Sequence, residues 1–264
     1  MKFLWVFFLC CALSSCARQV KFSDKASFNE KQIKPIPIEK PLKELKEGEK
    51  LIYAVDWIGI PAGIITLEVK DKVTIENAPA YHIVAKALPN KFFRFFHNVE
   101  YNVDSYIDIN SMKSVKFRKE RSLNGRITRE ETVFDYKNNE VTWHYFNSGS
   151  IKRIKIPENN QDLLSALYAF RVEEVKLGEA FNINIVYAGK AWPIRISLER
   201  EEEIQIPGCG AFRVILGKVS SRLSSHITGF NNIEVFISLD KNRLPVMFRM
   251  RTKIGYLSGI LSSQ

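Results

Sequence analysis

Apolar and polar side chains alternate with a period of two through most of the chain from Leu51 onward. The alternation is clearest in four segments, residues 141–145, 181–187, 194–199 and 233–239. A period of two is typical of β-strands that bury one face. The sequence holds about a dozen such segments, which favours an antiparallel barrel or sandwich over an alternating α/β sheet.

Turn signals separate these segments. Asn124-Gly125 is the strongest of them, Asn138-Asn139 is a second, and Asp240-Lys241-Asn242 is a third. Asparagine and glycine tolerate the positive φ angles of tight hairpin turns, so these positions predict hairpins between neighbouring strands.

One segment follows a helical period instead. The polar residues 160–162 precede apolar residues spaced as one face of a helix: Leu163, Leu164, Leu167, Tyr168 and Phe170. This pattern predicts a capped helix that ends near Val175, ahead of Gly178. A single helix among strands would close one end of a barrel or pack across one face of a sheet.

The N-terminus carries an export signal. Lys2 precedes an apolar run, and the run ends in Leu13-Ser14-Ser15-Cys16. These four residues resemble the lipobox of bacterial lipoproteins, which implies cleavage before Cys16 and acyl chains on its thiol and amine. A plain secretory signal and an uncleaved anchor are the alternatives, although an anchor needs about 20 apolar residues. Since Ala17 is not Asp, the sorting rule of similar lipoproteins implies the outer membrane, facing the periplasm, in a host with two membranes.

The chain therefore divides into three predicted parts: a signal peptide (1–15), a lipidated cysteine with an extended tether (16–46), and one β domain (47–264). Pro35, Pro37 and Pro41 favour an extended course in the tether. Four apolar residues make part of the tether a candidate strap along the domain: Ile33, Ile36, Ile38 and Leu42.

Charge and cysteine content limit the partners. The net charge is +10, or +9 once the single charge of Lys2 is removed with the signal. A basic protein beside a membrane meets anionic lipids or acidic glycans, and nucleic acid is not expected in that compartment. With Cys10 and Cys11 removed and Cys16 acylated, Cys209 is the one free thiol, and we expect it to be a buried apolar side chain.

The sequence contains no recognisable catalytic or metal-binding motif. We therefore expect no cofactor, no metal and no enzymatic activity. An unrecognised hydrolase would require paired carboxylates, for which Asp56, Asp104, Asp108 and Glu100 are the candidates.

Two clusters are candidates for binding. Phe92, Phe93, Phe95 and Phe96 surround Arg94. Such a cluster suits a membrane-dipping loop or the lip of a lipid pocket, but we expect a short helix that plugs the barrel with its rings buried. A basic run follows between residues 113 and 129, and it is either a solvated hairpin face or a surface for anionic lipid, an acidic glycan or an envelope partner. Its candidate residues are Lys116, Arg118, Arg121, Arg126 and Arg129.

Three segments together resemble an uncharacterised family of exported bacterial proteins, the domain of unknown function thirty-one-zero-eight. They are residues 48–63 with Tyr53 and Trp57, residues 162–171 with Arg171, and residues 237–255 with Pro245. The resemblance implies a mainly β fold, an antiparallel, flattened or partly open barrel with one helix packed against or capping it. It supplies no activity, cofactor or catalytic residue.

Within these segments, Gly59 and Gly63 are expected to flank a turn at Pro61. Arg171 is expected to pair with a buried carboxylate such as Asp240, or otherwise to bind the anionic head of a ligand. The leading functional hypothesis is a membrane-tethered protein that binds a lipid or another amphiphile in a barrel; a scaffold acting through the basic hairpin is the second. The candidate ligand-binding residues are Trp57, Phe92, Phe93, Phe95, Phe96 and Arg171.

Overall fold

The computed structural model describes residues 38–75, 77–96, 98–221, 231–252 and 255–263. The predicted signal peptide, Cys16 and the tether up to Pro37 lie outside the described residues. The strands are β1 (Lys50–Trp57), β2 (Ile60–Val69), β3 (Val73–Ile75), β4 (Ala78–Pro89), β5 (Val99–Asp108), β6 (Ser114–Leu123), β7 (Arg126–Asp135), β8 (Glu140–Tyr145), β9 (Ser150–Lys155), β10 (Asn160–Gln161), β11 (Ala180–Tyr187), β12 (Lys190–Ile206), β13 (Gly210–Ser221), β14 (Asn231–Ser238), β15 (Pro245–Arg251) and β16 (Tyr256–Ser263). The helices are α1 (Lys91–Phe96) and α2 (Leu163–Val172).

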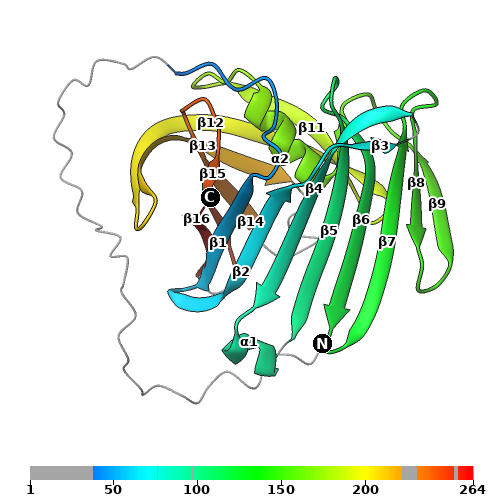
Figure 1. The fold of residues 1–264 in the computed structure, drawn as a ribbon, viewed down its shortest axis with the longest axis horizontal. Coiled ribbons are helices and arrows are strands. Elements are labelled where there is room, and N and C mark those ends of the chain that lie inside the picture. The colour runs from blue at the N-terminus through cyan, green and yellow to red at the C-terminus, as the bar shows by residue number, and fades with distance from the viewer. Residues whose placement is uncertain (1–37, 76, 97, 222–230, 253–254, 264) are drawn as a thin grey trace. The chain divides into compact units, whose positions relative to one another are not determined.

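All sixteen strands belong to one sheet, ordered β10-β11-β12-β13-β14-β15-β16-β1-β2-β4-β5-β6-β7-β8-β9, with β3 paired to β4. Every pairing is antiparallel except that of β10 with β11. The hydrogen-bonded order ends at β9 and β10, so the sheet is rolled but not closed (Figure 1). The predicted fold, a partly open antiparallel barrel with a helix, is confirmed.

Side-chain contacts bring the two halves of the rolled sheet together where backbone hydrogen bonds do not. Near the β11–β12 turn, the Tyr187 hydroxyl accepts a hydrogen bond from Lys119 Nζ of β6 at 2.8 Å. Val186 packs in a cluster with Phe117, Phe134 and Val141 from β6, β7 and β8. These contacts keep the open sheet curled around an interior.

The predicted helix is present as α2 and ends at Val172, three residues before the expected end. Asp162 caps it, accepting hydrogen bonds from the backbone N–H groups of Leu164 and Ser165. The same carboxylate accepts hydrogen bonds from the hydroxyls of Ser105 at 2.7 Å and Ser114 at 2.5 Å. The cap therefore fastens α2 to β5 and to the start of β6.

Local turn chemistry explains the hairpins. Asn124 and Gly125 both have positive φ, 51° and 83°, as the predicted β6–β7 hairpin requires. The β1–β2 turn lies at Ile58 and Gly59, so the expected turn at Pro61 is wrong: Pro61 lies inside β2. Gly63 serves close packing instead, because a Cβ atom there would lie 2.3 Å from the carbonyl oxygen of Leu88.

The described end of the tether forms the expected strap. Glu39 N–H donates to the carbonyl of Leu239, and Leu42 N–H donates to the carbonyl of Lys241 at 3.0 Å. Leu45 is buried in the main core cluster. Ile33 and Ile36 lie outside the described residues. Residues 38–46 thus pack with the β domain, ahead of its predicted start at residue 47.

Candidate ligand cavity

An apolar cavity of about 410 Å³ lies between α2 and the sheet. The helix contributes Leu163, Ala166, Leu167 and Phe170 to its wall. The sheet contributes mostly isoleucine and valine side chains from β11 to β14, with Pro245, Phe248 and Met250 of β15 and with Tyr53, Ile65 and Leu67 of β1 and β2. The alternation seen in the sequence supplies this wall, because Ile194 and Ile196, and likewise Ile233, Val235 and Ile237, all face it.

Few polar side chains reach the cavity. Among the described residues, Ser221 and Tyr53 are the two polar side chains in its wall, and the Ser221 hydroxyl donates to the carbonyl of Pro193. The Tyr53 side chain is buried, and burial raises the pKa of its hydroxyl. That hydroxyl has no hydrogen-bond partner among the described residues. The wall therefore favours a hydrocarbon occupant, because an apolar hollow does not hold water well.

Arg171 lies in the last turn of α2 and is not part of the cavity wall. Its Nη1 and Nη2 atoms donate to the two carboxylate oxygens of Glu49 at 2.6 and 2.8 Å. Its Nε and Nη2 atoms also donate to the carbonyl of Asn242. The expected structural ion pair is present, but Asp240 is the wrong partner; Asp240 binds Ser238 and the backbone of its own turn instead.

The phenylalanine cluster forms the short helix α1, as expected, but it does not plug the barrel. The exposed fraction is 85% for Phe95 and 55% for Phe92 and Phe96. Only Phe93 is partly covered, and its ring lies 6.4 Å from that of Trp57. The buried-plug prediction is wrong because α1 caps a hairpin outside the sheet, where the rings pack on one another. Among the described residues, the cavity wall includes neither Trp57 nor any of the four phenylalanines.

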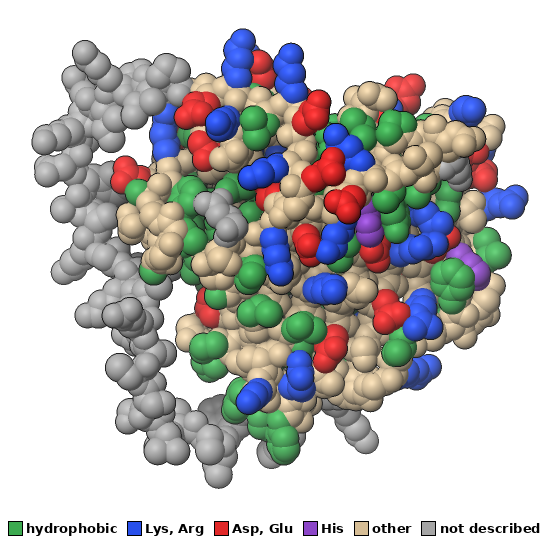
Figure 2. All heavy atoms as spheres, viewed as in Figure 1, with side chains coloured by type: hydrophobic (Ala, Val, Ile, Leu, Met, Phe, Trp, Pro, Cys, Tyr) green, Lys and Arg blue, Asp and Glu red, His purple; other side chains and the backbone are tan. Residues whose placement is uncertain are grey.

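The basic hairpin carries its own counter-charges. Lys116 Nζ and Arg118 Nε lie 3.1 and 2.6 Å from the Glu131 carboxylate. Arg129 pairs with Glu120 at 2.6 Å. Desolvation raises the pKa of Glu131, but hydrogen bonds from Arg118 and Lys116 outweigh it, so the pKa is lowered. Figure 2 shows basic and acidic side chains interleaved across this face.

The two other candidates of the run differ in exposure. Arg121 stacks over the Tyr101 ring, with its guanidinium carbon 5.9 Å from the ring centroid. Arg126 is exposed at the β6–β7 turn. Glu131 of β7 and Glu120 of β6 thus neutralise much of the positive charge of the run, which is not a uniformly positive surface.

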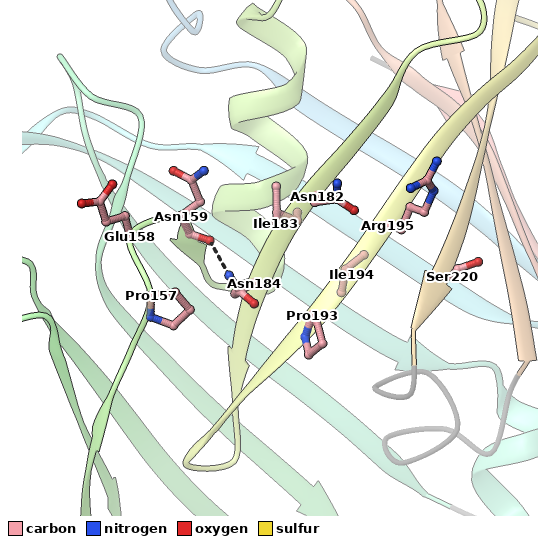
Figure 3. A pocket seen from close by; sticks show the side chains of 10 residues that line it. All are labelled: Pro157, Glu158, Asn159, Asn182, Ile183, Asn184, Pro193, Ile194, Arg195 and Ser220. Atoms are coloured by element: carbon pink, nitrogen blue, oxygen red, sulfur yellow. Dashed lines mark hydrogen bonds between the residues drawn. The ribbon is translucent and has the colours of Figure 1, made fainter.

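A second hollow lies beside the cavity. It has a volume of about 450 Å³ and lies between the 157–159 segment and the β11–β12 pair (Figure 3). Asn182, Asn184 and Arg195 line it with Glu158, while Ile183 and Ile194 belong to the walls of both hollows. Asn159 and Asn184 are hydrogen-bonded across it (Figure 3). Because Asn182, Asn184 and Arg195 alternate with Ile183 and Ile194 along β11 and β12, these polar side chains lie on the opposite face of the two strands from the apolar cavity.

The carboxylates considered for catalysis do not converge. Asp104 accepts from His82 at 2.7 Å, and Asp108 binds the turn that follows it. Asp56 accepts from the backbone of Gly59, and Glu100 lies 3.6 Å from Arg94. Within the described ranges, no group of three or more His, Cys, Asp or Glu side chains is arranged to hold a metal ion. The described helices include none long and apolar enough to cross a bilayer.

The sequence matches one family model over residues 52–261, which span β1 to β16. The chain belongs to the DUF3108 family. That family is described as a protein of unknown function, so membership of DUF3108 brings a fold but no activity. No curated protein matches the sequence.

Two solved structures resemble this DUF3108 chain. One is a β-barrel-like protein of the domain of unknown function DUF1849 from Brucella abortus, with 8% identity, a TM-score of 0.51, and coverage of 81% of this chain and 95% of that one. The other is a candidate lipoprotein from Parabacteroides distasonis, with 12% identity, a TM-score of 0.35, and coverage of 82% and 94%. The first supports the partly open barrel; at these identities neither carries a function across.

Proposed function

We propose that this protein is a membrane-anchored envelope lipoprotein that binds the apolar part of a lipid or another amphiphile in the cavity beneath α2. The observation that carries the proposal is the cavity itself, about 410 Å³ with a wall almost free of polar side chains. Small-molecule sites in proteins range from about 300 to 1,000 Å³ and are mainly apolar.

Burial of hydrocarbon supplies the affinity. Each buried CH₂ group contributes about 0.8 kcal/mol, so roughly ten of them contribute about 8 kcal/mol. Loss of translational and rotational freedom offsets a large part of this gain. A single acyl chain is therefore expected to bind with a dissociation constant in the micromolar range or weaker, which suits a ligand that must be released.

The anchor is the acylated Cys16, and the proposed location is the outer membrane, facing the periplasm, where the host has two membranes. Two or more acyl chains hold a protein firmly at a bilayer, whereas one does not. Cys16→Ser is expected to release the protein from the membrane fraction. A Cys16→Ser protein that stays in the membrane after a carbonate wash would refute the lipoprotein assignment.

The ligand proposal is tested by native mass spectrometry of the purified, processed full chain. Ala166 faces the cavity from α2, and Ala169 lies on the same helix outside the cavity wall. We expect an added mass that extracts into organic solvent, and we expect Ala166→Phe to lower uptake of a fluorescent fatty acid at least tenfold. Ala169→Phe is the matched control and should bind as the parent does. A clean apo mass with no uptake, or equal loss in both variants, would contradict the proposal.

A further inference from the structure

One end of the sheet differs from the other in composition. The turns β1–β2, β4–β5, β6–β7, β8–β9 and β15–β16 all lie at the end that carries α1, because antiparallel neighbours alternate in direction. We call this end the α1 tip. Pairings such as Gly63 with Pro89, Val99 with Leu123 and Trp57 with Leu257 place these turns along one edge.

Exposed apolar side chains concentrate at the α1 tip. Among the large hydrophobic residues that the structure describes as exposed, all except Leu42, Ile64, Leu163 and Leu177 lie at or next to these turns. They are Ile58, Ile60, Phe92, Phe95, Phe96, Ile127, Phe146, Ile151 and Tyr256. Soluble monomers rarely expose so many large apolar groups together, and such a patch marks an interaction surface.

The turns of the α1 tip carry only basic charges. The α1 tip exposes Lys91, Arg94, Arg126 and Arg251. The sequence has no Asp or Glu in residues 57–60, 90–98, 123–126, 146–150 or 252–256, which connect these strands. Asp56 and Glu100 are the acidic neighbours of the first two segments, and Glu100 lies 3.6 Å from Arg94. The connecting segments at the opposite end carry both signs of charge. The acidic residues there are Asp71, Glu158, Glu173, Glu174, Glu179 and Asp240, and the basic ones are Lys70, Lys72, Lys113, Lys137, Lys176, Lys241 and Arg243. Figure 2 shows hydrophobic and basic side chains gathered at the lower end, where Figure 1 places α1.

We propose that the α1 tip docks on the surface of an anionic phospholipid bilayer, with the α1 phenylalanines in the interfacial layer and the basic residues at the head groups. Aromatic rings and Lys or Arg side chains are the groups that favour this interface. Each basic residue near an anionic surface adds to the attraction, whereas the mixed charges of the opposite end largely cancel. Docking by the α1 tip is separate from anchoring through Cys16 and does not require an occupied cavity.

The test uses the full, processed chain reconstituted in vesicles of phosphatidylcholine and phosphatidylglycerol (3:1) with brominated acyl chains. An environment-sensitive fluorescent amino acid replaces Phe95 in one sample. In the other sample it replaces Leu177, which is an exposed apolar residue at the opposite end. Bromine quenches a fluorophore only on contact, so docking predicts blue-shifted, quenched emission at position 95 and neither change at 177. A tether alone leaves the domain free to tumble and predicts the same response at both positions.

Two further measurements complete the test. Lys91→Glu should reduce the quenching at position 95 several-fold, whereas Lys176→Glu, at the opposite end, should not reduce it. Equal responses at 95 and 177, or no effect of Lys91→Glu, would overturn the proposal. A concentration-dependent blue shift at position 95 without vesicles would assign the surface to a second copy of the chain and would also overturn it.

Discussion

The buried ion pair between Arg171 and Glu49 provides the sharpest test of how α2 is held. Arg171 is 5% exposed, and its guanidinium joins three segments: α2, the residue before β1 and the β14–β15 turn at Asn242. Arg171→Met keeps the aliphatic stem but removes every hydrogen bond to Glu49 and Asn242. The Glu49 carboxylate would then be left without its partner in a poorly solvated place.

The magnitude follows from burial. Removal of one partner from a buried ion pair costs about 3–5 kcal/mol. The Glu49 side chain is 16% exposed, so water relieves part of its penalty, and we expect a loss of about 2–4 kcal/mol in the free energy of unfolding. For a domain of this size, that loss corresponds to a fall of roughly 5–15 °C in Tm.

Urea unfolding followed by circular dichroism measures the loss, and a double-mutant cycle with Glu49→Gln isolates the pair. The double variant should be more stable than the sum of the two single losses by about 1–3 kcal/mol. Arg195→Met removes an exposed arginine and should change stability by less than about 0.5 kcal/mol. If Arg171→Met matched Arg195→Met, or if the coupling energy were near zero, the pair would not hold α2 in place.

Two further predictions concern the cap and the cavity wall. Asp162→Ala should cost about 2–4 kcal/mol in urea unfolding, since the cap is lost and the hydroxyls of Ser105 and Ser114 lose their buried acceptor, whereas Asp162→Asn should keep most of the stability. Burial raises the pKa of Asp162 above its ordinary 3.8. The stability that this carboxyl contributes is therefore complete below pH 3.8 and declines as the pH rises through its pKa in the folded protein. The stability of Asp162→Asn relative to the parent should increase from about pH 4 to about pH 7, and a difference that stays constant over this range would contradict the raised pKa. Gly259→Ala should lower the free energy of unfolding by about 1–3 kcal/mol, because its Cβ would lie 2.1 Å from the Phe248 ring. Phe248→Leu in the same chain should recover part of that stability. A melting temperature of Gly259→Ala equal to that of the parent would contradict this prediction and show that the ring moves freely.

Local chemistry made much of the fold predictable. The period-two segments became β8, β11, β12 and β14, and the Asn124-Gly125 dipeptide became the β6–β7 turn. The apolar residues from Leu163 to Phe170 lie in helix α2, which Asp162 caps. Each of these follows from the preferences of neighbouring residues, which a sequence displays directly. The structure has sixteen strands among the described residues where about a dozen were expected, and segments as short as β3 and β10, of three and two residues, carry no detectable period.

The site depended on distances that a sequence does not display. Arg171 finds its partner 122 positions away at Glu49, although Asp240 satisfied the same chemical argument. The isoleucines of β11 and β12 were recognisable as facing inward, but whether they enclose a hollow or a packed core depends on how tightly the sheet curls. The phenylalanines of α1 were expected to be buried because they are apolar, and only the register of β4 and β5 places them outside the sheet.

The register of the sheet links the two proposals. Met250 lines the cavity and is paired with Leu257 of β16. Leu257 is in turn paired with Trp57 of β1, whose ring lies against Phe93 of α1. Residues directly opposite each other in antiparallel strands point to the same face, so the inner surface of the cavity continues along this row to the α1 tip. A domain docked by that tip would hold the apolar wall next to the lipid layer, and an acyl chain could pass between them with little exposure to water. The Ala166→Phe and Lys91→Glu variants separate the two steps: the first should abolish loading while docking persists, and the second should weaken docking while fatty acid uptake from solution persists.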